Sequence, residues 1–138
     1  MERKEFIKKL TIGGSVLFAS PLLFNACTED NGMVDNQTSN DLVIDLNDAA
    51  YSALSTVGGF AYKDNIIIFT TGTDTYMALS KLCTHQQCTV SYNHSSGTVP
   101  CPCHGSIYST SGEVLNGPAT QALKQYTVTK DGNTLILK

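Results

Sequence analysis

The sequence lacks a long hydrophobic run. A membrane-spanning helix needs about 20 consecutive apolar residues, and the longest apolar stretch, residues 10–24, is shorter and is interrupted by Pro21. A basic start precedes this stretch, at Arg3, Lys4, Lys8 and Lys9. The pattern is typical of an export signal and predicts a leader over residues 1–27. An uncleaved membrane anchor is the alternative.

Positive charge is also scarce. Nine Lys and Arg residues stand against 12 Asp and Glu, for a formal net charge of −3. Residues 28–138 keep five basic and ten acidic side chains. Phosphate backbones attract basic surfaces, so this balance disfavours a nucleic-acid-binding function.

Residues 41–138 lack a long stretch with the 3.6-residue period of a helix, which predicts one all-β domain. The continuous apolar run 66–69 predicts a strand covered on both faces. Asp131-Gly132 predicts a hairpin turn between strands at 126–130 and 134–137. Elsewhere apolar residues alternate with polar ones, as at Leu42, Ile44 and Leu46.

Cysteine and histidine are few but concentrated. Two of the three histidines and four of the five cysteines lie in two short segments. The first box is Cys83-Thr84-His85-Gln86-Gln87-Cys88, and the second box is Cys101-Pro102-Cys103-His104-Gly105-Ser106. Structural zinc sites usually take paired ligands of one kind, whereas each box mixes a thiolate with an imidazole. A zinc site and a pair of ordinary disulfides are the alternatives to a cluster.

The two boxes resemble those of the Rieske iron–sulfur family, with the C-T-H-x-x-C and C-P-C-H-G-S patterns intact. The resemblance implies stacked antiparallel sheets with a 2Fe-2S cluster held at one tip by two loops. Cys83 and Cys101 would bind one iron, and His85 and His104 the other. With neutral imidazoles the oxidised cluster carries no net charge, so it accepts an electron at a higher potential than an all-thiolate cluster.

Further roles follow from the same resemblance. It implies a disulfide between Cys88 and Cys103, which would tie the two loops together. Ser106 would donate to a bridging sulfide and Tyr108 to the thiolate of Cys83, and both bonds would raise the potential. The simpler interpretation of Tyr108 is a half-buried strand residue. Residues 117–119 resemble the family's proline loop, which covers the cluster as a third loop.

Two positions depart from the family pattern. Quinol-oxidising members usually read C-T-H-L-G-C, whereas this chain has Gln86 and Gln87. A carboxamide makes the surface beside His85 more polar than Leu would. His94, in the polar stretch between the boxes, is expected to be a solvated loop residue.

The expected disulfide agrees with export, because disulfides persist outside the cytosol. Residues 23–27 resemble a lipobox and predict lipidation of Cys27. Residues 3–8 resemble a twin-arginine signal, with Sec export as the alternative. The polar, acidic residues 28–40 predict a flexible tether. We therefore expect a bacterial protein anchored to the membrane and facing the periplasm or the exterior.

Three functions follow from the resemblance. The first is the electron-transfer subunit of a quinol-oxidising, cytochrome bc-type membrane complex, with a cytochrome as a partner that suits the acidic chain. The second is the small subunit of another exported oxidoreductase, such as an arsenite-oxidase-like enzyme, or a stand-alone carrier. The third is a lipoprotein module with a structural or sensory cluster. The domain is too short to hold a catalytic site as well, so no catalysis is expected from the chain alone.

Overall fold

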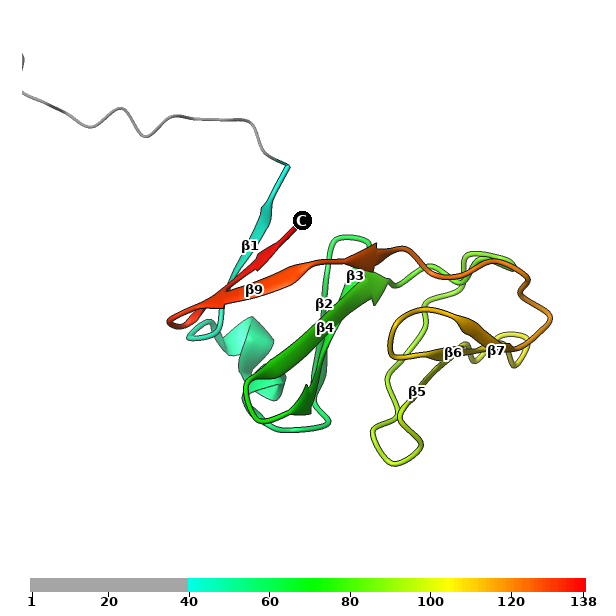
Figure 1. The fold of residues 1–138 in the computed structure, drawn as a ribbon, viewed down its shortest axis with the longest axis horizontal. Helices are drawn as coiled ribbons and strands as arrows, with labels where there is room; N and C mark the ends of the chain where they lie inside the picture. The colour runs from blue at the N-terminus through cyan, green and yellow to red at the C-terminus, as the bar shows by residue number, and fades with distance from the viewer. Residues whose placement is uncertain (1–39) are drawn as a thin grey trace, which may run out of the picture. The chain divides into compact units, whose positions relative to one another are not determined.

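The computed structural model describes residues 40–138. The expected leader, Cys27 and the expected tether up to residue 39 lie outside the described residues. Three antiparallel sheets build the described part (Figure 1), which confirms the all-β prediction. Their strand orders are β1-β10-β9, β2-β3-β4-β8 and β5-β6-β7. The strand bounds are β1 Leu42–Asp45, β2 Phe60–Lys63, β3 Ile66–Gly72, β4 Thr75–Ser80, β5 Thr98–Pro100, β6 Ile107–Ser109, β7 Val114–Asn116, β8 Gln125–Tyr126, β9 Val128–Asp131 and β10 Thr134–Leu137.

Strand β3 separates two hydrophobic cores. Successive side chains of a strand point to opposite faces of its sheet. Ile67 and Phe69 pack into the core that also contains the first cysteine of each box. Ile66 and Ile68 pack into a second core beneath β1 and β10. The prediction of a strand covered on both faces is therefore confirmed.

The predicted C-terminal hairpin is present, but its turn lies one residue further on. Asp131 pairs with Thr134, so the two-residue turn is Gly132-Asn133. Gly132 has a φ of 56°, which glycine adopts without a Cβ clash. The expected strand at 126–130 is divided, because Tyr126 pairs in one sheet and Val128 in another.

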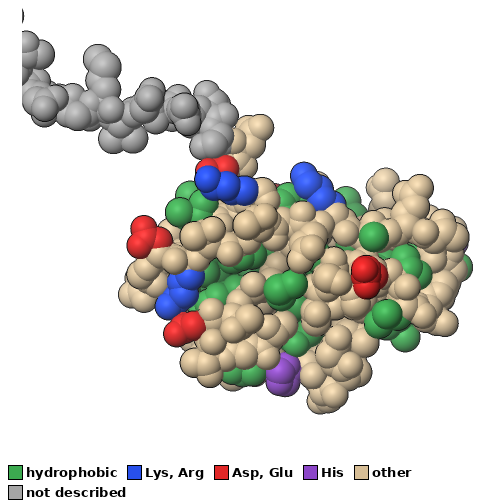
Figure 2. All heavy atoms as spheres, in the orientation of Figure 1, with side chains coloured by type: hydrophobic (Ala, Val, Ile, Leu, Met, Phe, Trp, Pro, Cys, Tyr) green, Lys and Arg blue, Asp and Glu red, His purple; other side chains and the backbone are tan. Residues whose placement is uncertain are grey.

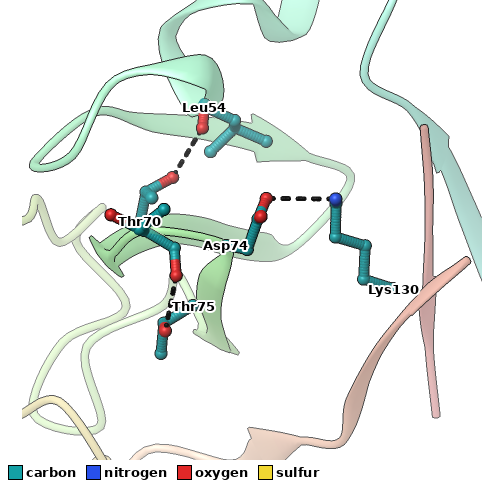
Figure 3. Close-up of polar contacts among 6 residues, drawn as sticks. Leu54, Thr70, Asp74, Thr75 and Lys130 are labelled. Carbon is teal, nitrogen blue, oxygen red and sulfur yellow. Dashed lines mark hydrogen bonds and ion pairs between the residues drawn. The ribbon is translucent and has the colours of Figure 1, made fainter. Parts of the chain in front are cut away.

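The sequence prediction missed one helical segment, the 3₁₀ helix η1 (Ala49–Ser55). The Asp48 side chain caps it by accepting a hydrogen bond from Ala50 N–H. The buried Thr70 hydroxyl of β3 donates to the Leu54 carbonyl at 2.8 Å and fixes the helix against the sheet (Figure 3).

An ion pair joins the β1-β10-β9 sheet to the β2-β3-β4-β8 sheet. Lys130 Nζ of β9 lies 3.0 Å from a carboxylate oxygen of Asp74, in the turn between β3 and β4 (Figure 3). Both side chains are substantially exposed, so the pair contributes little to stability.

The loops that contain the two boxes extend from the β5-β6-β7 sheet, at the end of the molecule away from β1 and β9 (Figure 1). The segment that contains the boxes begins after β4 and ends before β8, and these two ends lie side by side. Ser80 N–H donates to the Lys124 carbonyl at 2.8 Å. The Tyr62 hydroxyl donates to the Val90 carbonyl and fastens the two parts together. Among the described residues, no helix has the length and apolar character required to cross a membrane.

Candidate metal centre

The two boxes fold into loops with the same backbone bonding. In the first box, Cys83 N–H donates to the Cys88 carbonyl at 2.8 Å, and Gln87 N–H donates to the Cys83 carbonyl at 2.7 Å. The second box repeats both bonds from Cys101, at 2.7 and 3.2 Å. The backbone N–H and carbonyl of the first cysteine are therefore bonded to equivalent positions in the two loops.

A disulfide joins the two loops. Cys88 and Cys103 are bonded, with their Cα atoms 6.4 Å apart. This is the pairing that the family resemblance implied. Because the bond crosses from the first box to the second, it fixes the separation of the two loops.

The remaining cysteines form a buried pair. Cys83 and Cys101 are each 2% exposed and unbonded covalently. The two thiols are close enough for each to shift the pKa of the other. The pair lies in the core of the box-bearing end, together with Tyr108.

The surroundings distinguish these two thiols. Burial raises the pKa of Cys83, but donation from Tyr108 and from the backbone N–H of His85 outweighs it, so the pKa of Cys83 lies below its ordinary value. Burial raises the pKa of Cys101, and the neighbouring Cys83 raises it further. Cys83 therefore loses its proton first.

The two box histidines form an exposed pair beyond the thiols. The ring centroids of His85 and His104 are 4.9 Å apart, and the rings meet edge to face at 81°. Both side chains are exposed to solvent. Among residues 40–138, no three His, Cys, Asp or Glu side chains converge on a single metal ion; the four box side chains form two like pairs instead.

The Tyr108 hydroxyl lies at the centre of a buried network. It is 3.2 Å from Cys83 Sγ and 3.0 Å from Thr84 Oγ1, and it accepts a bond from Thr84 N–H at 3.1 Å. Tyr108 is fully buried, so it is not the half-buried strand residue of the simpler interpretation. Burial raises the pKa of Tyr108, and the bond to Cys83 raises it further.

Three polar side chains attach the third loop to the boxes. Ala119 N–H donates to the buried Ser106 hydroxyl at 3.0 Å. From the first box, the Thr84 hydroxyl donates to the Gln121 carbonyl at 2.7 Å. The third contact comes from β7, where Asn116 Nδ2 donates to the carbonyls of Gly105 and Gly117.

The sequence prediction missed Thr84 and Asn116. Thr84 lies within the C-T-H pattern, so its position beside two ligand candidates was the available signal. Asn116 had no signal, because its role depends on the carbonyls that the fold brings near it. His94 is exposed, as expected, and its Nδ1 lies 3.0 Å from the Tyr92 hydroxyl.

The donor set fits a 2Fe-2S cluster with two Cys and two His ligands. Such a cluster needs two sulfur ligands on one iron and two nitrogen ligands on the other. The thiols and the imidazoles are paired in this way, and each loop contributes one of each. Within the described residues, the Ser106 hydroxyl hydrogen has no acceptor, so this buried donor is free to meet a bound group.

Comparison with known proteins assigns the family. Residues 45–127, more than half of the chain, match the family model of the Rieske [2Fe-2S] domain. The chain therefore belongs to the Rieske family, whose cofactor is the Rieske 2Fe-2S cluster.

Similar proteins include iron-sulfur subunits of cytochrome b6-f complexes. The chain is 32% identical over 78 residues to the cytochrome b6-f complex iron-sulfur subunit of Chlorobaculum tepidum, covering 56% of this chain and 43% of that protein. It is 42% identical over 69 residues to the cytochrome b6-f complex iron-sulfur subunit 2 of Cyanophora paradoxa, covering 49% and 29%. The chain thus spans less than half of the length of these curated relatives.

A solved structure also resembles the chain. The plasma membrane Rieske protein PetC3 of Synechocystis PCC 6803 aligns with a TM-score of 0.51 and 29% identity, over 58% of this chain and 84% of that one. The ferredoxin of carbazole 1,9a-dioxygenase from Nocardioides aromaticivorans aligns with a TM-score of 0.54, but at 21% identity, over 59% of this chain and 86% of that one, it shows the shared fold alone.

Proposed function

We propose that the chain transfers single electrons through its Rieske cluster as the iron–sulfur subunit of a quinol-oxidising, cytochrome bc-type membrane complex. The observation that carries the proposal is the arrangement of the box side chains, with a buried thiol pair behind an exposed imidazole pair. The printed names of the cytochrome b6-f relatives support the assignment to this class of complex.

Four side chains hold the cluster in this proposal. Cys83 and Cys101 would bind one iron, and His85 and His104 would bind the other. When bound, the cluster accepts and releases one electron. Each imidazole has a second ring nitrogen, which can hold a proton that accompanies the electron. Because both rings are exposed, a docked partner can reach that nitrogen directly.

The buried hydroxyls set the affinity for the electron. Tyr108 lies within hydrogen-bond distance of Cys83 Sγ, and the Ser106 hydroxyl hydrogen is free to donate to a sulfide. Donors to sulfur stabilise the more electron-rich state and so raise the potential. The proposal therefore places this protein toward the upper end of the Rieske range of about −150 to +300 mV.

The disulfide and the third loop protect the site. Cys88 and Cys103 hold the two loops at a fixed separation. Residues 117–121 are attached to both loops through Thr84 and Ser106. Of the four candidate ligands, the two thiols are buried and the two imidazoles are exposed.

Anchoring and export are part of the proposal. We propose that the domain lies outside the cytosol. Its anchor to the membrane is either a lipid on Cys27 or the segment 1–27, retained as an uncleaved membrane anchor. Mass spectrometry of the protein from membranes distinguishes these, since the first gives an acylated Cys27 and the second an intact Met1. Loss of export in a twin-arginine-deficient strain, but not in a Sec-impaired strain, would assign the route.

Two measurements test the function. The purified protein should give a rhombic EPR signal on reduction. If a proton accompanies the electron, its midpoint potential should fall as the pH rises. Membranes from a strain that lacks the chain should lose quinol:cytochrome c reductase activity. If the protein gives the EPR signal but its deletion leaves the reductase activity unchanged, membership of this complex is excluded. The electron-transfer role is not.

One observation favours a second function. Gln86 places an exposed carboxamide next to His85, where the quinol-oxidising pattern has Leu. A polar side chain suits docking to a different redox partner, as in the small subunit of another exported oxidoreductase or a stand-alone carrier. Co-purification with a molybdopterin subunit, rather than with a cytochrome b, would support this alternative.

A further inference from the structure

Charge is distributed unevenly in the domain. Residues 40–138 contain five lysines, six aspartates and one glutamate. In the segment 82–123, which contains both boxes and the third loop, the only one of these is Glu113. On the face drawn in Figure 2, lysine side chains lie away from the end formed by the loops, which is mostly hydrophobic or uncharged polar.

Three loops form one exposed surface, which we call the tip: residues 84–87, 102–105 and 117–121, except the buried Ala119. The Cys88–Cys103 disulfide joins the first two loops, and the Thr84 hydroxyl joins the first to the third. The tip has no Asp, Glu, Lys or Arg. Its polar side chains are hydroxyl, imidazole and carboxamide groups, at Thr84, His85, Gln86, Gln87, His104, Thr120 and Gln121.

The charges closest to the tip in sequence lie outside its three loops. Glu113 lies in the turn between β6 and β7, at the opposite end of that hairpin from the second box, and this turn bonds to Leu123, whose N–H donates to the Gly112 carbonyl at 2.8 Å. Lys124 follows the third loop, but its Nζ lies 4.5 Å from the centroid of the Tyr126 ring in β8. Lys81 precedes the first box, and its Nζ lies 5.9 Å from the Tyr62 ring centroid in β2.

We propose that the tip docks on an uncharged, hydrogen-bonding protein surface of its electron partner, and that charge does not steer this encounter. Charges further apart than about 8 Å are largely screened at physiological ionic strength. The neutral imidazoles and the balanced charge of the oxidised cluster add no net charge to the tip. The recognition groups are therefore the carboxamides of Gln86 and Gln87, which act only at short range.

This inference rests on the proposed electron transfer at the tip and names the chemistry of the partner. It differs from what the net charge suggests. An acidic chain would be expected to attract a basic cytochrome, but the acidic residues of the described part lie outside the tip. Electrostatic steering depends on the local potential at the docking surface, which here is close to neutral.

The test measures the charge that reaction partners encounter at the tip. The oxidised holoprotein, whose cluster carries no net charge, is reduced in a stopped-flow instrument by dithionite, a divalent anion, and by hexaammineruthenium(II), a divalent cation. Reduced cytochrome c, a basic protein, serves as the protein probe. For each, we expect the rate constant to change less than about twofold between about 100 and 500 mM salt, because distant charges are screened in this range and an uncharged site has no charge to screen.

Matched variants locate the effect. Gln86→Glu adds one negative charge to the tip, and Asn133→Asp adds the same charge in the β9–β10 turn. At about 100 mM salt, Gln86→Glu should speed reduction by the cationic reagent and slow reduction by the anionic one by about threefold, and about 500 mM salt should largely remove the difference. Asn133→Asp should behave like wild type within about twofold.

The failures are distinguishable. A chain that gives no rhombic EPR signal overturns the proposed function together with this inference. A chain that binds the cluster, but whose wild-type rates change with salt in opposite directions for the two inorganic reductants, overturns the docking inference alone. An equal response of Gln86→Glu and Asn133→Asp would do the same, because net charge rather than the tip would then govern the encounter.

Discussion

Gln87 and Gly105 occupy equivalent positions in the two box loops. Each lies four residues after the first cysteine and donates its N–H to that cysteine's carbonyl. Both have left-handed backbone angles, with φ values of 58° and 78°. Glycine adopts this conformation freely, whereas a residue with a Cβ is strained there by about 1–2 kcal/mol.

Replacing Gln87 with Gly should therefore stabilise the protein. The relief of strain exceeds the entropy that glycine gains in the unfolded chain, so we expect a net gain of about 0.5–1 kcal/mol. Urea unfolding of the holoprotein, followed by the visible absorbance of the cluster, measures the shift in midpoint. Gln86→Gly is the control, because Gln86 has no positive φ, and it should not stabilise. Equal losses in both variants would refute the strain argument.

Tyr108→Phe should lower the midpoint potential and leave the cluster in place. The hydroxyl lies 3.2 Å from Cys83 Sγ, and a donor there stabilises the reduced state. A hydrogen bond stronger by about 1 kcal/mol in the reduced state corresponds to about 40 mV, since 59 mV is a tenfold change for one electron. Protein-film voltammetry measures the shift, and the EPR signal reports that the cluster is intact.

Tyr92→Phe is the matched control for Tyr108→Phe. Tyr92 is buried in the same core and stacks on Phe69, but its hydroxyl lies beside His94 rather than a cysteine. We expect its potential to stay within about 10 mV of wild type, because no bond to the ligand sulfur is lost. If both variants lowered the potential equally, general disturbance of the core would be the cause, and the role of Tyr108 would be rejected.

Removing the disulfide should destabilise the domain. Cys88 and Cys103 are 15 residues apart, and a loop of that size gives about 3 kcal/mol of stabilisation. The double variant Cys88→Ala/Cys103→Ala should unfold at lower urea concentration and lose its visible absorbance faster. Dithiothreitol should have the same effect on wild type and no further effect on the variant. A variant as stable as wild type would show that the three contacts to the third loop suffice.

The sequence predicted the features that depend on residue chemistry or short spacing. The two boxes admit few uses, so their spacing and the family resemblance led to the cluster. The apolar run 66–69 suggested a strand covered on both faces. The η1 helix was missed because seven residues of 3₁₀ helix are too few to show a helical period in the sequence. The change of sheet at Thr127 was missed because Thr127 pairs with Lys138 through the backbone alone. Such backbone contacts carry no side-chain signature.

The polar contacts around the candidate site could not be predicted from the sequence either. The Thr84 hydroxyl meets the Gln121 carbonyl across 37 positions of the chain. Its residue type fits many roles, and only the folded loops select one of them. Hydrogen positions in this network can nevertheless be worked out from the acceptors that are present. Thr84 gives its hydroxyl hydrogen to Gln121, so any hydrogen shared between Thr84 and Tyr108 must come from Tyr108.

Thr84→Val should therefore shift the potential in the opposite direction to Tyr108→Phe. In the native network, the single hydroxyl hydrogen of Tyr108 has two acceptors, Cys83 Sγ at 3.2 Å and Thr84 Oγ1 at 3.0 Å. Valine has nearly the same shape as threonine and removes the competing acceptor. The Tyr108 hydrogen then bonds to sulfur alone, which stabilises the reduced state and raises the potential by about 10–30 mV.

The stability of the Thr84→Val variant should change the other way. It loses the bond to the Gln121 carbonyl, so the third loop should open more easily and the free energy of unfolding should fall by about 1–2 kcal/mol. Thr84→Ser retains the hydroxyl and should restore both the potential and the stability. A potential that fell in Thr84→Val would mean that the threonine orients Tyr108 toward the sulfur rather than competing with it. The opposite movements of potential and stability thus separate competition for one hydrogen from simple loosening of the loop.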